Sequence, residues 1–404
     1  MIQISRRRAL VLGTLAMAGP LLSFPRLARS TATASLSEAS ARFGLDLLVH
    51  LASQGRNKLN LALSPASLMA VLALAEIGAD PELDEALGKL LHLDGTSNFT
   101  DLRASLAPLI SGRVSRGPVS GIDAVYIDQQ VTLKRSALAA FGALHAKVEK
   151  GRLADPEAVE QINALVRSAT KGKIPSIIDA PVPQAGIVLL NALHFKDSWR
   201  RKFNAEATRQ ADFHVAAGGT KRVSMMQGDV QLLSAAQKGA FAAVRLPYET
   251  EGYSLILVVN RQKAAEPAEF AAHAGWLAGV GFKDYFVTLA LPRFSVTSGG
   301  DVLPALDALG LAPARSAPGA LAGLSDLPLQ IAAMPQKVAI TVDEGGTTAA
   351  AATAGVVLTT ARPPPAGLPS MEFMADKPFM FALHDEINGF IMMCGYVGDP
   401  LDTA

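Results

Sequence analysis

The sequence predicts an α+β fold, with helices in the first half of its 404 residues and strands in the second. Before about residue 187, apolar side chains recur at helical spacing. After it, short runs are apolar throughout or alternate with polar residues. Half of the residues are hydrophobic and only 18% are charged, which excludes a disordered chain. Helices and strands segregated in this way favour an antiparallel or mixed sheet.

Residues 1–34 have the pattern of an export signal. They contain five arginines and no acidic residue, an apolar run over residues 9–19, and Ala32-Thr33-Ala34 before an expected cleavage point. The run is too short to cross a membrane, which takes about 20 apolar residues. Ser5-Arg6-Arg7-Arg8 resembles a bacterial twin-arginine signal; an ordinary Sec signal is the alternative. Both predict that the mature chain, residues 35–404, is exported to the periplasm or the extracellular space.

The mature chain is close to neutral. Removing the five leader arginines from the 37 basic residues leaves 32 against 36 acidic ones, a formal charge of −4. With no basic excess, we expect no nucleic-acid partner, and no later apolar run is long enough for membrane insertion. Cys394 is the single cysteine, which excludes an intrachain disulfide and a multi-cysteine zinc site. In its apolar run it is expected to be a buried, unreactive thiol.

Helices and strands are expected in the following order. A first helix ends near Gly55, and its apolar face contains Phe43, Leu47, Leu48 and Leu51. Ser64-Pro65 and Asp155-Pro156 each supply an N-cap side chain and a first-turn proline, and the helices that follow end near Gly78 and Gly172. Strands are expected at Ile187–Phe195, Ser254–Asn260, Phe286–Leu291, Gln336–Asp343 and Phe390–Val397.

Residues 344–368 break this pattern. The segment begins with small residues and ends near three consecutive prolines, like an interdomain linker, but only about 35 residues follow it, too few for an independent core. It is therefore a long loop tied at both ends to one domain, and such loops are usually functional. As a strand, it would place only small residues on one face: Thr347, Ala349, Ala351, Thr353 and Gly355. The composition favours a loop that can become a strand.

Several motifs, in a fixed order, resemble those of the serpins, the serine protease inhibitors. The resemblance spans the mature chain and rests on many short matches, each weak alone. They are Asn60-Leu61-Ala62-Leu63-Ser64-Pro65, Asn191-Ala192-Leu193-His194-Phe195-Lys196 with Trp199 and Phe203, Thr208, Phe213-His214-Val215, Met225-Met226, Leu246-Pro247-Tyr248, Leu291-Pro292-Arg293-Phe294, Thr341-Val342-Asp343-Glu344-Gly345-Gly346-Thr347, Lys377-Pro378-Phe379 and Gly395.

The resemblance implies one domain of three β-sheets and eight to nine α-helices, with an exposed reactive-centre loop at about residues 344–368. It also implies that the protein is not an enzyme but a suicide inhibitor. A target serine protease attacks the loop, forms an acyl-enzyme, and is trapped when the cut loop inserts as a strand into the main sheet. We expect a monomer without a cofactor or metal, whose partner is the target serine protease.

The resemblance also assigns residues to the site. The loop hinge corresponds to Glu344, Gly345, Gly346, Thr347, Ala349, Ala350, Ala351 and Ala352. None of them is proline, bulky or charged within the part that would insert. The sheet-opening region corresponds to Ser64, Asn191, Trp199 and Gln336, although Trp199 also fits plain core packing. Gln336 departs from the family, in which many members have a histidine that can titrate near neutral pH.

The reactive bond follows from a count along the loop. Sixteen residues beyond Glu344, as in inhibitory relatives, place the cut between Thr360 and Ala361. A backward count from Pro378 instead gives a position near Gly367, within what resembles a proline-rich insertion. Leu358 and Arg362 are the alternatives, suiting chymotrypsin-like and trypsin-like proteases. The Thr360–Ala361 bond favours a target with a small apolar pocket, of elastase or subtilisin type.

Two other classes of function compete with inhibition. A non-inhibitory, serpin-like binding or chaperone module would share the fold without trapping a protease. A hydrolase would use Ser168-Ala169-Thr170-Lys171, which matches a Ser-x-x-Lys motif but lacks its Ser-Asp-Asn and Lys-Thr-Gly partners. The seven histidines form no i, i+4 pair of the kind that binds a metal. Loop composition favours inhibition.

Overall fold

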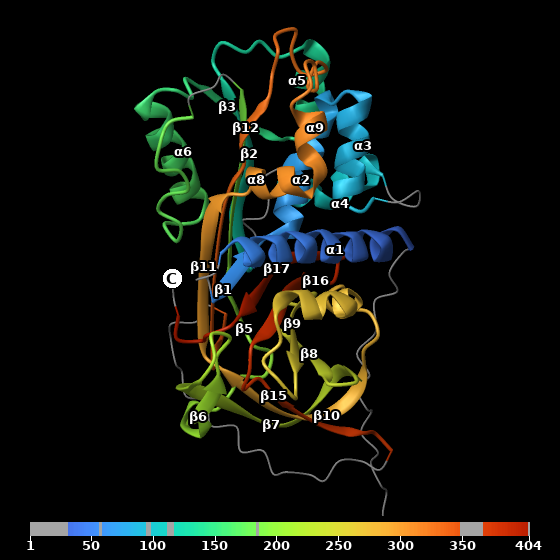
Figure 1. The fold of residues 1–404 in the computed structure, drawn as a ribbon, viewed down its shortest axis with the longest axis vertical. Coiled ribbons are helices and arrows are strands. Elements are labelled where there is room, and N and C mark those ends of the chain that lie inside the picture. The colour runs from blue at the N-terminus through green and yellow to red at the C-terminus, as the bar shows by residue number, and fades with distance from the viewer. Residues whose placement is uncertain are drawn as a thin grey trace, which may run out of the picture.

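The computed structural model describes residues 31–55, 59–93, 98–110, 117–182, 186–347 and 367–402. Along the chain, a helix-rich first half is followed by a strand-rich second half, as the sequence predicts (Figure 1). Most of the expected leader lies outside the described residues, and helix α1 (Thr31–Gln54) begins just before the expected cleavage point. Of the helices within these ranges, none is both long and apolar enough to cross a membrane.

The helices of the first half begin where the sequence signals place them. Helix α2 (Pro65–Ala75) follows Ser64, whose side chain accepts a hydrogen bond from the Ser67 amide, and the whole helix is buried. Helix α6 (Pro156–Ala169) follows Asp155, although that carboxylate makes no capping bond. The other elements up to residue 169 are β1 (Asn60–Leu63), η1 (Glu76–Gly78), α3 (Pro81–Leu90), α4 (Phe99–Ile110), β2 (Val119–Asp128), α5 (Arg135–Ala143) and β3 (Lys147–Gly151).

Strand β2 was not expected in the helix-rich half. It lies between two layers of helix, so both of its faces are buried and its sequence does not show simple alternation. Ile122, Ala124 and Tyr126 pack into the cluster that contains α6. Val119, Val125 and Ile127 pack into the main core with α2.

The second half contains all five predicted strands, and β4 (Ile187–Phe195) and β17 (Phe390–Val397) have the predicted bounds. The others are β9 (Tyr253–Asn260), β10 (Lys283–Pro292) and β13 (Pro335–Asp343). The remaining elements are β5 (Asp197–Ser198), η3 (Ala205–Ala207), β6 (Arg209–His214), β7 (Thr220–Lys238), β8 (Phe241–Pro247), η4 (Pro267–His273), α7 (Ala274–Leu277), β11 (Phe294–Asp301), α8 (Leu303–Leu306), η5 (Asp307–Leu311), α9 (Ala312–Arg315), β12 (Ile331–Ala333), β14 (Gly346–Thr347), β15 (Ser370–Met374) and β16 (Phe379–Asp385).

The strands form two hydrogen-bonded networks rather than three separate sheets. One has the order β1-β17-β16-β9-β8-β7-β10-β15, with β6 also paired to β7. The 19-residue strand β7 joins two of the expected sheets because one end pairs with β6, its middle with β10 and its other end with β8. The second network, β3-β2-β4-β13-β14-β5, has β11 on the outer side of β13. The α+β class is confirmed.

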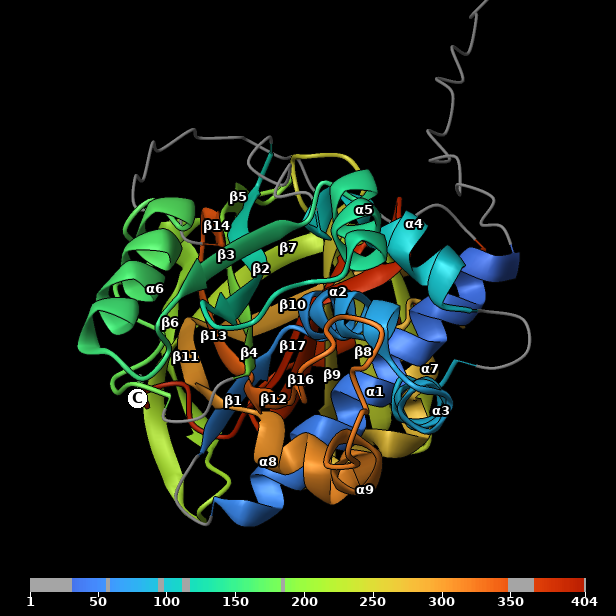
Figure 2. The same ribbon diagram turned by 90° about the horizontal axis from the view of Figure 1, so that it is seen from above.

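The second network contains the strand β13, which leads into the expected loop hinge. Helices cover both faces of this sheet. Figure 2 shows α6 on one face and α2 on the other. The main core continues from α2 through the second network into β9, β16 and β17, so residues from Leu36 to Val397 share one hydrophobic core. A single core of this extent agrees with one domain.

Two other predictions from the sequence concern this framework. Cys394 is buried in β17, as expected, and burial raises the pKa of its thiol. Ser168 and Lys171 lie at the C-terminal end of α6, where the Lys171 amide hydrogen-bonds to the Ser168 carbonyl. Within the described part of the chain, no cluster of His, Cys, Asp and Glu side chains is arranged to hold a metal ion.

Candidate functional site

The loop hinge begins as a short strand inside the sheet. After β13, the chain turns at Glu344 and Gly345 and returns as β14. Strand β14 pairs antiparallel with β13 on one side and antiparallel with β5 on the other. Because β5 continues the direction of β4 beyond Lys196, β14 occupies the position of a strand between β4 and β13. The hinge is thus already placed where an inserting loop would start.

The turn between β13 and β14 depends on Asp343 and Gly346. One carboxylate oxygen of Asp343, Oδ1, accepts hydrogen bonds from the amides of Gly345 (2.8 Å) and Gly346 (3.2 Å). Gly346 has a φ of 150°, and a Cβ built at this position would lie 2.1 Å from the Asp197 carbonyl oxygen. Only glycine allows β14 to approach β5 so closely.

Glu344 is anchored by an arginine from the link between two strands. Arg293, between β10 and β11, donates to both carboxylate oxygens of Glu344 at 2.7–2.9 Å, and the Thr208 hydroxyl donates at 2.5 Å. Burial alone would raise the pKa of Glu344, but these hydrogen bonds outweigh it and hold the pKa below its usual value. The hydrogen bonds with Glu344 raise the pKa of Arg293 in turn. Glu344 is therefore ionised and fixes the turn to the sheet.

A polar and aromatic cluster holds the rest of the hinge. The Trp199 amide donates to the Gly345 carbonyl and its indole N–H to the Asp343 carbonyl, both at 2.9 Å. The Trp199 ring stacks on Tyr248 with centroids 4.5 Å apart, and the Tyr248 hydroxyl meets the Thr347 hydroxyl at 2.5 Å. Thr347 has no exposed surface. These contacts give Trp199 a direct role at the hinge in addition to core packing.

A second group of polar side chains lies near the start of β13, away from the hinge and beside the start of α2. The Gln336 side chain donates to the Asn191 side-chain oxygen (2.6 Å) and the Ser64 carbonyl (3.3 Å), and accepts from the Ser64 amide (3.2 Å). Asn191 in turn donates to Asp123 on β2 at 2.5 Å. This group bridges β2, β4, β13 and α2, and all four residues are buried.

The predicted site residues thus fall into two places. Ser64, Asn191 and Gln336 come together as the resemblance implies, and Glu344, Gly345, Gly346 and Thr347 form the hinge turn with Trp199. Trp199 makes its contacts at the hinge rather than with the other sheet-opening residues. The remaining hinge residues, Ala349 to Ala352, and the residues named for the reactive bond, Leu358, Thr360, Ala361 and Arg362, lie outside the described part of the chain.

Four contributing residues were not assigned from the sequence: Asp123, Thr208, Tyr248 and Arg293. The last three are within motifs that carried the resemblance, but their partners depend on strand register, which spacing does not reveal. For Asp123, the sequence does contain an indication of a buried partner. This residue alternates with Gly121 and Val125 on one face of an otherwise apolar segment, and a lone acid on such a face is expected to have a specific partner.

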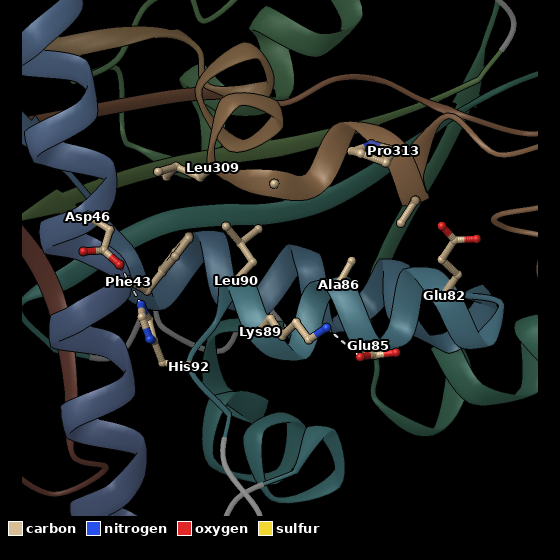
Figure 3. A pocket seen from close by; sticks show the side chains of 12 residues that line it. Phe43, Asp46, Glu82, Glu85, Ala86, Lys89, Leu90, His92, Leu309 and Pro313 are labelled. Atoms are coloured by element: carbon tan, nitrogen blue, oxygen red, sulfur yellow. Dashed lines mark hydrogen bonds and ion pairs between the residues drawn. The ribbon is translucent and has the colours of Figure 1, made fainter.

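A surface pocket lies away from the hinge (Figure 3). It has a volume of about 520 Å³ between α1, α3, η5 and α9. Four of its polar side chains form two pairs: His92 with Asp46 at 2.7 Å and Lys89 with Glu85 at 2.6 Å. These exposed pairs are satisfied within the protein, and nothing in the pocket selects a ligand.

The structure thus has a mixed sheet in which a short hinge strand, β14, lies between β13 and β5. Comparison with known proteins identifies the class. The family model for serpins, described as serine protease inhibitors, matches residues 38–400. The chain belongs to the serpin family.

Relatives and solved structures agree. A serpin-like protein of Thermococcus kodakarensis is 30% identical over 373 residues, covering 89% of this chain and 84% of the relative. The leukocyte elastase inhibitor of Bos taurus is 28% identical over 387 residues, covering 90% and 99%. The crystal structure of a highly specific serpin of the insect Tenebrio molitor superposes with a TM-score of 0.77 at 23% identity, covering 92% of this chain and all of that one. The serpin fold is confirmed, and serpins are protease inhibitors rather than enzymes.

Proposed function

We propose that this serpin is an exported bacterial suicide inhibitor of serine proteases, with a bait loop over residues 344–368 that is cut between Thr360 and Ala361. In the first step, the serine oxygen of the protease bonds to the Thr360 carbonyl carbon. The peptide bond to Ala361 breaks, and the serine proton ends on the new amino group of Ala361. The protease stays esterified to Thr360 while the cut loop inserts into the sheet.

The placement of β14 is the observation that carries this proposal. Its two residues pair antiparallel with both neighbours, so residues 348–360 would continue between β13 and β4 in the same orientation. Insertion then separates two strands that pair directly at Gln336–Ala339 and Asn191–His194, and gives each a new partner. The added strand gains backbone hydrogen bonds on both edges, which supplies the driving force.

The length of the loop fits the distance to be travelled. Residues 347–360 would span about 46 Å as an extended strand, at about 3.3 Å per residue. The nine residues of β13 span about 30 Å by the same measure. A protease attached at Thr360 would therefore be carried past the length of the strand beside which the loop inserts, from the hinge end of the sheet to its far end.

The sequence around the bond suggests the class of target. Thr360 follows Val356, Val357 and Leu358, which suits a protease with a small apolar primary pocket, of elastase or subtilisin type. The similarity to a leukocyte elastase inhibitor supports the elastase type. The leader predicts that the two proteins meet in the periplasm or outside the cell. The inhibitor acts as a monomer, and no cofactor enters the mechanism.

A panel of elastase-, subtilisin-, trypsin- and chymotrypsin-like proteases tests the proposal on a denaturing gel. A covalent complex that survives denaturation with an elastase- or subtilisin-type enzyme is the expected result. Clean cleavage without a complex across the panel would indicate the non-inhibitory binding module instead. Mass spectrometry of the released C-terminal fragment locates the bond. A fragment that begins at Ala361 is expected, whereas one beginning at Thr359 or within residues 363–368 would contradict the assignment.

A further inference from the structure

Three buried polar side chains form a row across the sheet. Asp123 on β2 is the register partner of Asn191 on β4, and Asn191 is the register partner of Gln336 on β13. All three lie on the face that packs against α2, since their neighbours two residues away along each strand belong to the main core. The row crosses the boundary between β4 and β13, where the proposed insertion takes place.

The hydrogen bonds along this row have one consistent direction. Gln336 is fixed at the start of α2, because it accepts from the Ser64 amide and donates to the Ser64 carbonyl. It donates to the side-chain oxygen of Asn191 (2.6 Å), and the Asn191 amide nitrogen donates to Asp123 (2.5 Å). Asp123 is thus the acceptor at the end of the row, and it determines which way the Asn191 amide points.

The contact between Asn191 and Gln336 must break when the sheet accepts a strand. Neighbouring strands lie about 4.8 Å apart, so a strand placed between β4 and β13 moves them to about twice that distance. A hydrogen bond of 2.6 Å cannot persist across that gap. The Asn191–Gln336 pair therefore acts as a clamp on the closed sheet, and whatever orients Asn191 controls the clamp.

Asp123 is ionisable, and no other charge among the described residues faces it. The neighbours on its face are apolar along β2, β4 and β13, and α2 contains no ionisable residue. His194 and Lys337 lie on the opposite face of the sheet, by the alternation of β4 and β13. The residues of α4 that carry charge are Asp101 and Arg103, and Arg103 is paired with Glu76.

Burial raises the pKa of Asp123 to about 7, although the hydrogen bond from Asn191 lowers it. The Ser67 hydroxyl makes no direct hydrogen bond among the described residues, yet lies near enough to Asp123 to favour its ionised form. Both protonation states are therefore populated near neutral pH. Opening the sheet beside Asn191 admits water and reduces the cost of the charge, so the open sheet prefers the ionised carboxylate.

We propose that Asp123 is a positioning residue of the insertion site: as a neutral acid it holds the Asn191–Gln336 clamp closed, and its ionisation eases the separation of β4 from β13. The inference rests on the proposed function for its biological role, but the opening of the sheet can be measured without a protease. The proton passes to solvent, and no other reactant is needed.

Amide hydrogen exchange of residues 191–194 and 336–339 in the full chain, corrected for intrinsic rates, tests the proposal between pH 6 and pH 8. In the wild type, opening is expected to be more frequent at pH 8 than at pH 6 by up to about tenfold, which is the limit for a carboxyl whose pKa is about 7 in the closed sheet and much lower in the open one. Asp123→Asn keeps an acceptor for Asn191 but cannot ionise, so its opening should not depend on pH. Asp212→Asn, on exposed β6, is the matched control and should behave like the wild type.

Ser67→Ala provides a second variant that leaves Asp123 in place. Loss of the hydroxyl beside the carboxylate should move the midpoint of the pH effect upward. A wild type without pH dependence, or one whose dependence persists in Asp123→Asn, would overturn the proposal. If hydrogen exchange shows the expected pH dependence but no protease is trapped, Asp123 still controls sheet opening and the proposed inhibitory function is wrong. If neither the rate of protease trapping nor the exchange rate depends on pH, the proposed role of Asp123 is wrong, while the inhibitory function still holds.

Discussion

The burial of Thr347 shows how firmly the hinge is held in the sheet. Its side chain is fully buried and its hydroxyl pairs with that of Tyr248. Thr347→Arg would place an unpaired charge there, at a cost of several kcal/mol, so the hinge is expected to leave the sheet. The variant should melt at a lower temperature and be cleaved by the protease without being trapped, as a denaturing gel would show.

Thr347→Ser is the matched control for this variant. It keeps the hydroxyl that meets Tyr248 and removes only a methyl group, so trapping should be close to that of the wild type. Full trapping by Thr347→Arg, with one protease bound per inhibitor, would mean that this hinge is assigned wrongly.

Glu344 gives a prediction about pH. Its pKa in the folded protein is lower than the usual value of 4.5, so its pairing with Arg293 stabilises the fold above that pH. This contribution is lost as the pH falls through the lower, folded-state pKa. Glu344→Gln should lower stability by about 1–3 kcal/mol near neutral pH and by less at an acidic pH, where Glu344 becomes protonated. Chemical denaturation at both pH values measures the difference, with Glu372→Gln on the exposed face of β15 as the control.

Individual residues of the site could be predicted only where a motif carried them. Ser64, Asn191 and Gln336 were grouped through the resemblance, and hydrogen bonds join the three residues in the structure. Asp123 was missed because its link to Asn191 depends on the pairing of β2 with β4, 68 residues apart. Spacing along the chain does not determine such a register.

Strand β14 is the element on which the site depends, and Gly346 is its weakest point. Gly346→Ala would force a Cβ to within 2.1 Å of the Asp197 carbonyl at a φ that alanine rarely adopts. We expect β14 to lose its pairing with β5, a fall in stability of about 2–3 kcal/mol, and loss of trapping. Gly88→Ala in helix α3 meets no atom within 4 Å and should be neutral or slightly stabilising. Equal melting temperatures for the two variants would contradict this account of the hinge.

Elements with a strong local pattern were predicted well. The apolar run of β4 sufficed for its bounds, the alternation of β13 placed that strand to within one residue, and proline with a capping side chain fixed the start of α2. The two-residue strands β5 and β14 could not be predicted, because they owe their form to the strands on either side. The same holds for β2, whose two buried faces hide the alternation.

At the scale of the whole molecule, a chain of 404 residues would ordinarily suggest two or three domains. The structure instead has one main core that extends from Leu36 to Val397, with a smaller cluster between α6 and the sheet. The α+β class followed from the order of the predicted elements. The joining of two sheets through β7 did not, because one long strand with three partners is set by tertiary contacts.

The melting temperature of the intact protein, compared with that of the protein cut within residues 348–366, tests strand insertion most directly. Cleavage frees the loop to fill the place between β4 and β13 that β14 begins, and the new strand adds hydrogen bonds along two edges. Calorimetry should show a rise of at least about 10 °C, the shift that about 8 kcal/mol gives in a chain of this size. An unchanged or lower melting temperature after cleavage would contradict the insertion mechanism.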